Sequence, residues 1–346
     1  MENIYVNRPL MYLDADGEIL QASNSEPAFI FHLAELLDVR PGHRVLEVGC
    51  GTGWLLALLS HAVGSTGEVF GVEINEYLGA QAQANISRMD IANATVMVGD
   101  GFKNIETAAF DRIIVTASVY EVPIKLVHLL DEGGLALLPI RNRGLSEEAQ
   151  LLRKSGNRLE SQVTRVCKFV PMIAHEVGSQ GYILPRLEDN DTFRAIKHRI
   201  AGERTSTFGQ EHVSDMLKNS LGFTGYLSKV EPDFNGFAIG DYSSGGLATA
   251  IFGDPDAYGF GLINAKNRTA AIWHKGSVTA YGTTQAMDRF FELGATWSEL
   301  GRPSGYAFGL TVTEKDDQIE DEGPVFPEHR KEVTLWWKLR DPAFRK

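Results

Sequence analysis

The chain has 346 residues, which is enough for two domains of ordinary size. Its 33 Lys and Arg against 45 Asp and Glu give a formal charge of −12, which argues against a general nucleic-acid binder because such proteins normally carry a basic surface. The two cysteines stand in no CxxC or Cys/His pattern, which excludes a disulfide framework and argues against a structural zinc site. The first twenty residues resemble no signal peptide, and no run approaches the roughly 20 apolar residues of a membrane span, so we expect a cytoplasmic protein.

The first half of the chain alternates helical and strand patterns. Helical spacing of apolar residues predicts helices at 27–37, 54–63, 76–89 and 123–130. Short apolar runs predict strands at 44–48, 68–73, 94–98, 110–116 and 135–139. This alternation indicates βαβ units and a parallel sheet. Two further runs, at 149–153 and 159–169, flank the turn sequence Ser155-Gly156-Asn157 and predict an antiparallel pair that completes the sheet.

The second half has a different pattern, with short strand-like runs between Gly, Asn and Asp turns. The expected helices lie at 192–201, 213–221 and 285–300. The expected strands lie at 236–239, 247–252, 259–263, 270–274, 277–281, 306–312 and 332–338. We therefore predict an α/β domain over residues 1–178, with helices on both faces of a Rossmann-like sheet, followed by an α+β domain over residues 179–346.

The strongest chemical signal is the run Gly49-Cys50-Gly51-Thr52-Gly53, which follows a predicted strand and precedes a predicted helix. Glycines there let the backbone turn tightly and approach a ligand. Glu73 stands about 20 residues further on, at the end of the next strand, where an acid can accept the ribose hydroxyls of an adenosine cofactor. NAD proteins use G-x-G-x-x-G, whereas the G-x-G-x-G spacing here favours S-adenosylmethionine, which has no pyrophosphate. A plain tight turn is the remaining interpretation.

Two later strands also end in candidate cofactor contacts. Asp100-Gly101 follows the third strand, where a carboxylate can accept from the adenine amino group, although Asp-Gly is also a common turn sequence. Thr116 ends the fourth strand, on the side expected to face the methyl donor.

Residues 18–176 resemble the protein-L-isoaspartate O-methyltransferases, which are class I methyltransferases that esterify a side-chain carboxylate. The features that carry the resemblance are the Ser25-x-Pro27 step, the glycine-rich run, Gly99-Asp100-Gly101, the strand at 110–116, and Phe169-Val170-Pro171-Met172. The resemblance implies S-adenosylmethionine as the cofactor, S-adenosylhomocysteine as its product, and no metal. The cofactor-binding residues it implies are Glu47, Gly49, Cys50, Gly51, Gly53, Glu73, Ile74, Asp100, Gly101 and Thr116.

By the same resemblance, Ser25 lies beside the acceptor carboxylate and Glu47 lies close to the active centre. A helix N-cap is the competing role for Ser25, and for Glu47 it is the capping of nearby backbone amides. The sequence departs from the family at Asn24, Glu26 and Asn104, largely around the acceptor pocket. These departures leave the cofactor prediction intact and leave the acceptor open.

We therefore expect a carboxyl O-methyltransferase that acts on a peptide or protein at an Asp or isoaspartyl side chain or at the C-terminus. The long second half resembles extensions found in enzymes that tailor ribosomally made peptides, and it is the expected substrate-recognition part. Two alternatives stay open at this point. One is a methyltransferase for RNA or a small molecule, and the other is a non-catalytic binding protein on a methyltransferase fold.

Overall fold

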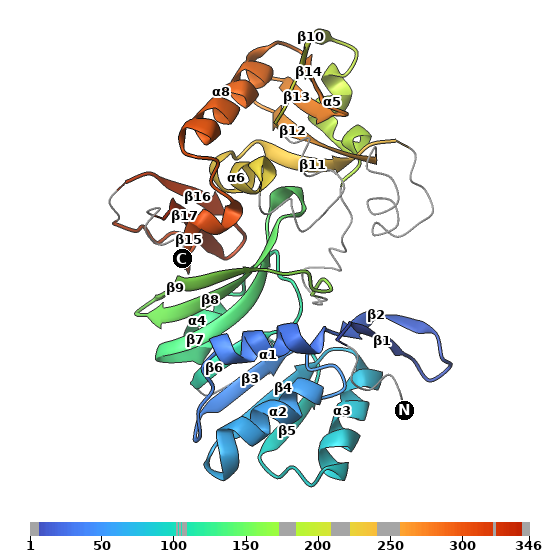
Figure 1. The fold of residues 1–346 in the computed structure, drawn as a ribbon, viewed down its shortest axis with the longest axis vertical. Coiled ribbons are helices and arrows are strands. Elements are labelled where there is room, and N and C mark those ends of the chain that lie inside the picture. The colour runs from blue at the N-terminus through green and yellow to red at the C-terminus, as the bar shows by residue number, and fades with distance from the viewer. Residues whose placement is uncertain are drawn as a thin grey trace.

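The computed structural model describes residues 7–101, 103, 105, 109–172, 185–208, 222–240, 257–320 and 323–340. Two layered units lie along the long axis of the molecule, joined by a group of strands between them (Figure 1). Several expectations fall outside the described residues: the helix at 213–221, the strand at 247–252, the boundary at 178, and the departure at Asn104.

A ten-stranded sheet has the order β16-β17-β15-β9-β8-β7-β6-β3-β4-β5. Its parallel strands are β3 (Arg44–Val48), β4 (Glu68–Glu73), β5 (Ala94–Val98), β6 (Phe110–Val115) and the start of β7 (Leu130–Arg141). The antiparallel strands β8 (Glu147–Ser155) and β9 (Arg158–Val166) follow. The predicted parallel sheet and its closing antiparallel pair are therefore present.

Helices cover both faces of this sheet, as predicted. These helices are α1 (Pro27–Leu36), α2 (Trp54–Val63), α3 (Glu76–Arg88) and α4 (Lys125–Leu129). Side chains alternate across a strand, so β3 sends Val45 toward α1 and α2, and Leu46 toward α4 on the opposite face. Both positions are fully buried. A strand buried on both faces is expected to be an unbroken apolar run, which is why these strands were readable from the sequence.

An N-terminal hairpin precedes the first predicted element. It pairs β1 (Leu10–Leu13) with β2 (Ile19–Asn24) in antiparallel fashion. The turn is closed by Asp14, whose carboxylate accepts from the backbone N–H groups of Asp16 and Glu18 at 2.9 Å each. The hairpin lies beside the first residues of α1 (Figure 1).

A second sheet, at the far end of the molecule, has five strands in the order β10-β14-β13-β12-β11. The strands are β10 (Ile200–Thr205), β11 (Phe234–Ala238), β12 (Tyr258–Asn264), β13 (Thr269–His274) and β14 (Ser277–Tyr281). The helices around it are α5 (Asp191–Ile196), α6 (Phe223–Val230) and α8 (Gln285–Glu299). The α+β character expected of this half is confirmed.

The predicted helix at 192–201 is wrong beyond Ile196. The Asn190 side chain caps α5 by accepting from the N–H of Phe193 at 2.9 Å, and the chain then turns into β10. Among the described strands, β10 pairs only with β14, and it is exposed along most of its length, so it carries no alternation of apolar residues that would reveal a strand. Pairing with its neighbour therefore overrides the local pattern.

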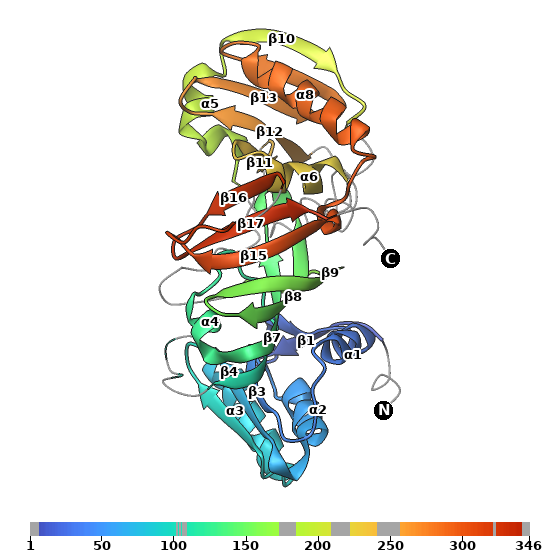
Figure 2. The ribbon, with the colours of Figure 1, turned by 90° about the vertical axis from the view of Figure 1, so that its left-hand side faces the viewer.

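The last three strands return to the large sheet. β15 (Phe308–Glu314) pairs with β9 through Thr311 opposite Glu160 and Val312 opposite Leu159. β17 (Val333–Leu339) and β16 (Val325–His329) then continue the sheet to its edge. Figure 2 shows β15, β16 and β17 between β9 and the five-stranded sheet. The second half of the chain thus contributes strands to both sheets.

Candidate active site

A cavity opens at the carboxyl ends of β3, β4 and β6, where ligands bind in open α/β sheets. The residues predicted from the sequence converge there. Those that line the cavity are Ser25, Glu47, Gly49, Cys50, Gly51, Glu73, Ile74, Asp100, Gly101 and Thr116. Gly53 is the exception. It is the left-handed N-cap of α2, with φ 83°, and packs against Ala82 of α3.

The loop between β3 and α2 brings backbone to the cavity wall. Gly51 has φ 53°, and a Cβ atom there would stand 2.6 Å from the Tyr12 hydroxyl oxygen. At Gly49, with φ 90°, a Cβ atom would stand 2.9 Å from Thr116 Oγ1. That hydroxyl lies 2.6 Å from the Gly49 carbonyl oxygen and 3.1 Å from that of Val48, so Thr116 fixes the loop. The glycines are therefore required by close approach on both sides.

Glu73, at the end of β4, is buried and ties two segments of the site together. One carboxylate oxygen accepts from the Gly51 N–H at 2.8 Å, and the other accepts from the Asn75 N–H at 2.9 Å. A carboxylate offers about four acceptor positions, so two bonds leave room for two more. Two neighbouring ribose hydroxyls would fill that capacity, so this residue fits an adenosine cofactor.

Glu47, in β3, is 2% exposed and lies on the cavity wall. Among the described residues, no hydrogen-bond donor reaches its Oε2 atom. Burial, followed by the negative charge of Glu73, raises the pKa of this carboxyl to about 8. A buried acid with one orphaned oxygen that faces a cavity is suited to a cationic ligand group. The amino group of a methionine moiety has that chemistry, so Glu47 also fits the cofactor.

The part of the cavity that Asp100 lines combines a polar and an apolar contribution. Asp100 is buried, and the loop that carries it is joined to β4 by the Gly99 N–H, which donates to the Glu73 carbonyl at 2.8 Å. Ile74 and Leu78 add apolar surface to the same wall. Cys50 is buried, and burial, followed by the negative charges of Glu47 and Glu73, raises the pKa of its thiol, which favours the protonated form.

Ser25 lies between the end of β2 and the start of α1, and it lines the cavity. The N-cap of α1 is Glu26, one residue further on, and the Ala28 N–H donates to the Asn7 side chain at 2.8 Å. The helix is therefore capped from outside, and the competing N-cap role of Ser25 is not the one it has here.

Tyr12 of the hairpin is a site residue that sequence reasoning missed. Its ring lines the cavity, and its hydroxyl bonds to Thr52 of the glycine-rich loop. Burial raises the pKa of this phenol. The available signal was the run Asp14–Gly17 between two short apolar segments, which is typical of a hairpin that could fold over the neighbouring motif.

The described residues contain no group of three or more His, Cys, Asp or Glu side chains that could hold a metal ion. Within the same residues, no helix is long and apolar enough to cross a membrane.

Comparison with known proteins decides which cofactor this geometry serves. The family model described as Protein-L-isoaspartate(D-aspartate) O-methyltransferase (PCMT) matches residues 2–177. The chain belongs to this family. The family confirms the expected enzyme class, a carboxyl O-methyltransferase, and the expected cofactor, S-adenosylmethionine. The NAD interpretation, the plain turn and the non-catalytic alternative are thereby set aside.

Curated relatives from this family cover the first half of the chain. A protein-L-isoaspartate O-methyltransferase of Fervidobacterium nodosum is 37% identical over 150 residues, which span 43% of this chain and 74% of the relative. One of Pyrobaculum islandicum is 34% identical over 171 residues, spanning 49% and 79%.

The fold likeness extends further along the chain than these matches do. A solved protein-L-isoaspartate O-methyltransferase aligns with 90% of this chain and 84% of its own, with a TM-score of 0.50 and 21% identity. This alignment shows that the two proteins share a fold, and it includes most of the second half of the present chain.

Proposed function

We propose that the chain transfers a methyl group from S-adenosylmethionine to the side-chain carboxylate of an isoaspartyl or aspartyl residue in a peptide or protein. One observation carries this proposal. A single cavity joins the acids that fit the cofactor, Glu47 and Glu73, to Ser25 at the start of α1. The residue proposed for the acceptor side and the residues proposed for the cofactor therefore line the same cavity.

The chemistry needs little from the protein beyond position. The cofactor supplies an electrophilic methyl group on a sulfonium: the new bond forms between carboxylate oxygen and methyl carbon, the carbon–sulfur bond breaks, and its electrons stay on sulfur. A carboxylate with an ordinary pKa near 4 is ionised at pH 7, so no general base is required. Holding the two reactants in line can lower the barrier by up to about 7–11 kcal/mol.

Each residue has a role that follows from its place. Glu73 would hold the ribose hydroxyls, and Glu47 would hold the cationic amino group through its orphaned oxygen. The Ser25 hydroxyl would donate to the incoming carboxylate and orient it. Tyr12 and the hairpin would shield the glycine-rich loop from water.

A second candidate, a dedicated peptide substrate such as a ribosomally made precursor, is favoured by the acceptor side of the cavity. Asn24, where the family usually has an apolar residue, lines the cavity next to Ser25. Glu26, a second departure, accepts a hydrogen bond from the Asn7 side chain just before α1. These polar replacements favour an acceptor that differs from a general damaged protein.

Incubation of the full chain with labelled cofactor and three matched peptides tests both candidates. The peptides carry an isoaspartyl residue, an aspartyl residue at the same position, or neither with a free C-terminus. Label on the isoaspartyl peptide supports the general acceptor. Label on the aspartyl peptide alone agrees with side-chain methylation but supports a dedicated substrate, and label on the C-terminus alone supports a dedicated substrate and contradicts side-chain methylation. Label in an RNA fraction with none in any peptide would contradict both.

Ser25→Ala is the matched variant for this assay. It should lower methyl transfer to the peptide by about tenfold or more while the affinity for S-adenosylhomocysteine, measured by calorimetry, stays within about twofold. Equal loss of both would place Ser25 in the cofactor site or in the fold instead.

A further inference from the structure

The loop at 116–122, which follows β6, connects the cavity to the second half of the chain. Its first residues, Thr116 and Ala117, line the cavity. Ser118 is joined to another lining segment of the cavity, residues 170–172, since its N–H donates to the Val170 carbonyl at 2.8 Å and its carbonyl accepts from the Met172 N–H at 2.9 Å.

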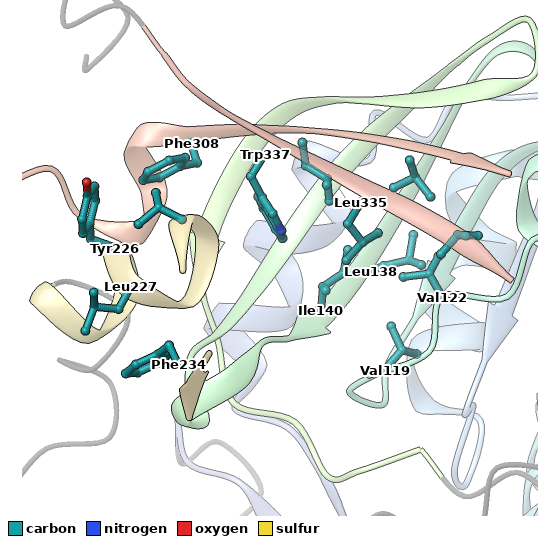
Figure 3. Packing of buried hydrophobic residues seen from close by; sticks show 14 of the residues in the cluster. Val119, Val122, Leu138, Ile140, Tyr226, Leu227, Phe234, Phe308, Leu335 and Trp337 are labelled. Carbon is teal, nitrogen blue, oxygen red and sulfur yellow. The ribbon is translucent and has the colours of Figure 1, made fainter. Parts of the chain in front are cut away.

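Further along, the same loop lies on β7. The Val119 N–H donates to the Pro139 carbonyl at 2.8 Å, and the Arg141 N–H donates to the Val119 carbonyl at 2.8 Å. Val119 and Val122 are buried and face Leu138 of β7 and Leu335 of β17 (Figure 3). The position of this loop therefore depends on a strand contributed by the second half of the chain.

The turn between β16 and β17, residues 330–332, reaches the outer side of this loop. The Arg330 guanidinium stands 4.5 Å from the centre of the Tyr120 ring, and its Nη2 donates to the Arg141 carbonyl at 3.2 Å. The Lys331 N–H donates to the Glu121 carboxylate at 3.0 Å. Two short segments that are more than two hundred residues apart in sequence are thus joined side by side.

A further contact joins this turn to the end of the loop. The Glu332 carboxylate accepts from the N–H of Ile124, the N-cap of α4, at 3.3 Å. This contact fixes the loop at the point where it becomes a helix.

The turn is itself held by a buried polar chain. Arg330 is 4% exposed and donates through Nε and Nη2 to Glu328 Oε1 at 3.3 and 3.1 Å. The other oxygen of Glu328 accepts from Trp337 Nε1 at 3.1 Å. The Lys229 ammonium of α6 lies 3.7 Å from the Trp337 ring centre and 2.7 Å from Glu148 Oε2 in β8. The turn therefore has a fixed place relative to α6 and β8.

We propose that Arg330 is a positioning residue for methyl transfer: the 330–332 turn holds the loop at 116–122, and with it the acceptor side of the cavity, in the arrangement that accepts the substrate. This inference rests on the proposed function. Among the described residues, none after Met172 lines the cavity, so the second half acts on the site through this loop. Arg330 acts by holding the loop at 116–122 in place and does not contact the reactants.

The double variant Glu121→Ala/Glu332→Ala removes two side-chain contacts between the 330–332 turn and the loop. It opens no cavity in the core, because neither carboxylate is buried. Glu292→Ala is the matched control, since it removes an exposed carboxylate that pairs with Arg289 at 2.9 Å on α8, away from the cavity. Amide hydrogen exchange of residues 116–122 reports the loop directly, and steady-state kinetics with the best peptide reports the acceptor side.

The double variant should exchange in residues 116–122 about tenfold faster than the full wild-type chain. Its KM for the peptide should rise about fivefold, while its affinity for S-adenosylhomocysteine stays within about twofold. Arg330→Met should speed the exchange of the loop and raise the KM for the peptide more than the double variant does, again without changing the affinity for S-adenosylhomocysteine. Arg330→Lys should recover only part of it, because an ammonium lacks the planar fork that reaches Glu328, Tyr120 and Arg141 together.

Faster exchange without any change in KM would overturn the proposal, because the turn would then be only structural. Exchange and KM equal to those of Glu292→Ala would also overturn it. If the wild-type chain methylates no peptide, the proposed function fails separately. The exchange of residues 116–122 then still decides whether the turn holds the loop.

Discussion

Two acids on one cavity wall, Glu47 and Glu73, show how neighbouring residues of the same type differ by environment. Glu73 has two backbone N–H donors, whereas Glu47 has an oxygen that no described residue reaches. Both were predicted from the sequence, because each stands at a fixed place relative to the glycine-rich strand. The orphaned oxygen of Glu47 was not predictable, since it depends on everything that packs around β3.

Glu47 makes the stability of the cofactor-free protein depend on pH. Burial raises its pKa from 4.5 to about 8, so the folded state binds more protons than the unfolded state between these pH values. The stability that protonated Glu47 contributes is fully present below pH 4.5 and is lost as pH rises through 8. The free energy of unfolding of the wild type, minus that of Glu47→Gln, should therefore fall by at most about 1.4 kcal/mol per pH unit across this window.

Urea denaturation of both proteins from pH 4.5 to 8.5 measures this difference. Gln keeps the size of Glu47 but does not titrate. The contributions of the other titrating groups therefore cancel when the two free energies of unfolding are subtracted. A difference in unfolding free energy that stays constant from pH 4.5 to 8 would contradict the raised pKa of Glu47.

At the scale of elements, the buried charge pair between α6 and β8 sets the packing of the second half against the first. Lys229 and Glu148 are both fully buried, with Nζ and Oε2 2.7 Å apart. Burial lowers the pKa of Lys229, and the nearby Glu148 opposes that shift. Such a pair is costly to bury, and removing one partner leaves the other charge without compensation.

Lys229→Met should lower the free energy of unfolding by about 3–5 kcal/mol, because Glu148 would remain buried and unpaired. Lys229→Met/Glu148→Gln should recover part of this loss, since neither member of the pair is then charged. Arg158→Ala removes a half-exposed ion pair with Glu160 and should change stability by less than about 1 kcal/mol. Denaturant unfolding of the wild type and these three variants checks the prediction, and a double variant no more stable than Lys229→Met would contradict it.

Some helices and strands could be predicted from the sequence, and others could not. β3, β4 and β5 were predicted at their observed bounds, because their apolar runs are bounded by turn residues. β16 was missed, since it contains Pro327, which is tolerated at the edge of a sheet but weakens any strand pattern. α6 was missed as well, although Phe223, Tyr226, Leu227 and Val230 recur at helical spacing, because it is only eight residues long and contains Gly225.

At the scale of the whole molecule, the large sheet contains strands from both halves of the chain. The sequence suggested two successive domains, since the second half has a different strand pattern, and a division at 178 stays a prediction. Pairing between β9 and β15 could not be read from the sequence, because it joins residues about 150 positions apart and leaves no local signal.

This continuity predicts what a chain cut at residue 178 would do. Removing residues 179–346 uncovers the edge of β9 at Leu159 and the apolar side chains of Leu138 and Ile140, which pack in one cluster with Leu335 and Trp337. An uncovered strand edge and apolar face favour aggregation and cost several kcal/mol of stability. The truncated chain should therefore melt at least about 10 °C below the full chain, or fail to remain monomeric.

Thermal unfolding and light scattering of the two chains, side by side, measure this difference. Separately expressed residues 179–346, added during refolding, should raise the melting temperature of the truncated chain by covering the same edge and face. A truncated chain that melts cooperatively near the full chain and binds S-adenosylhomocysteine equally well would contradict the prediction. It would show that the first half folds as an independent methyltransferase domain and that the shared sheet adds little to its stability.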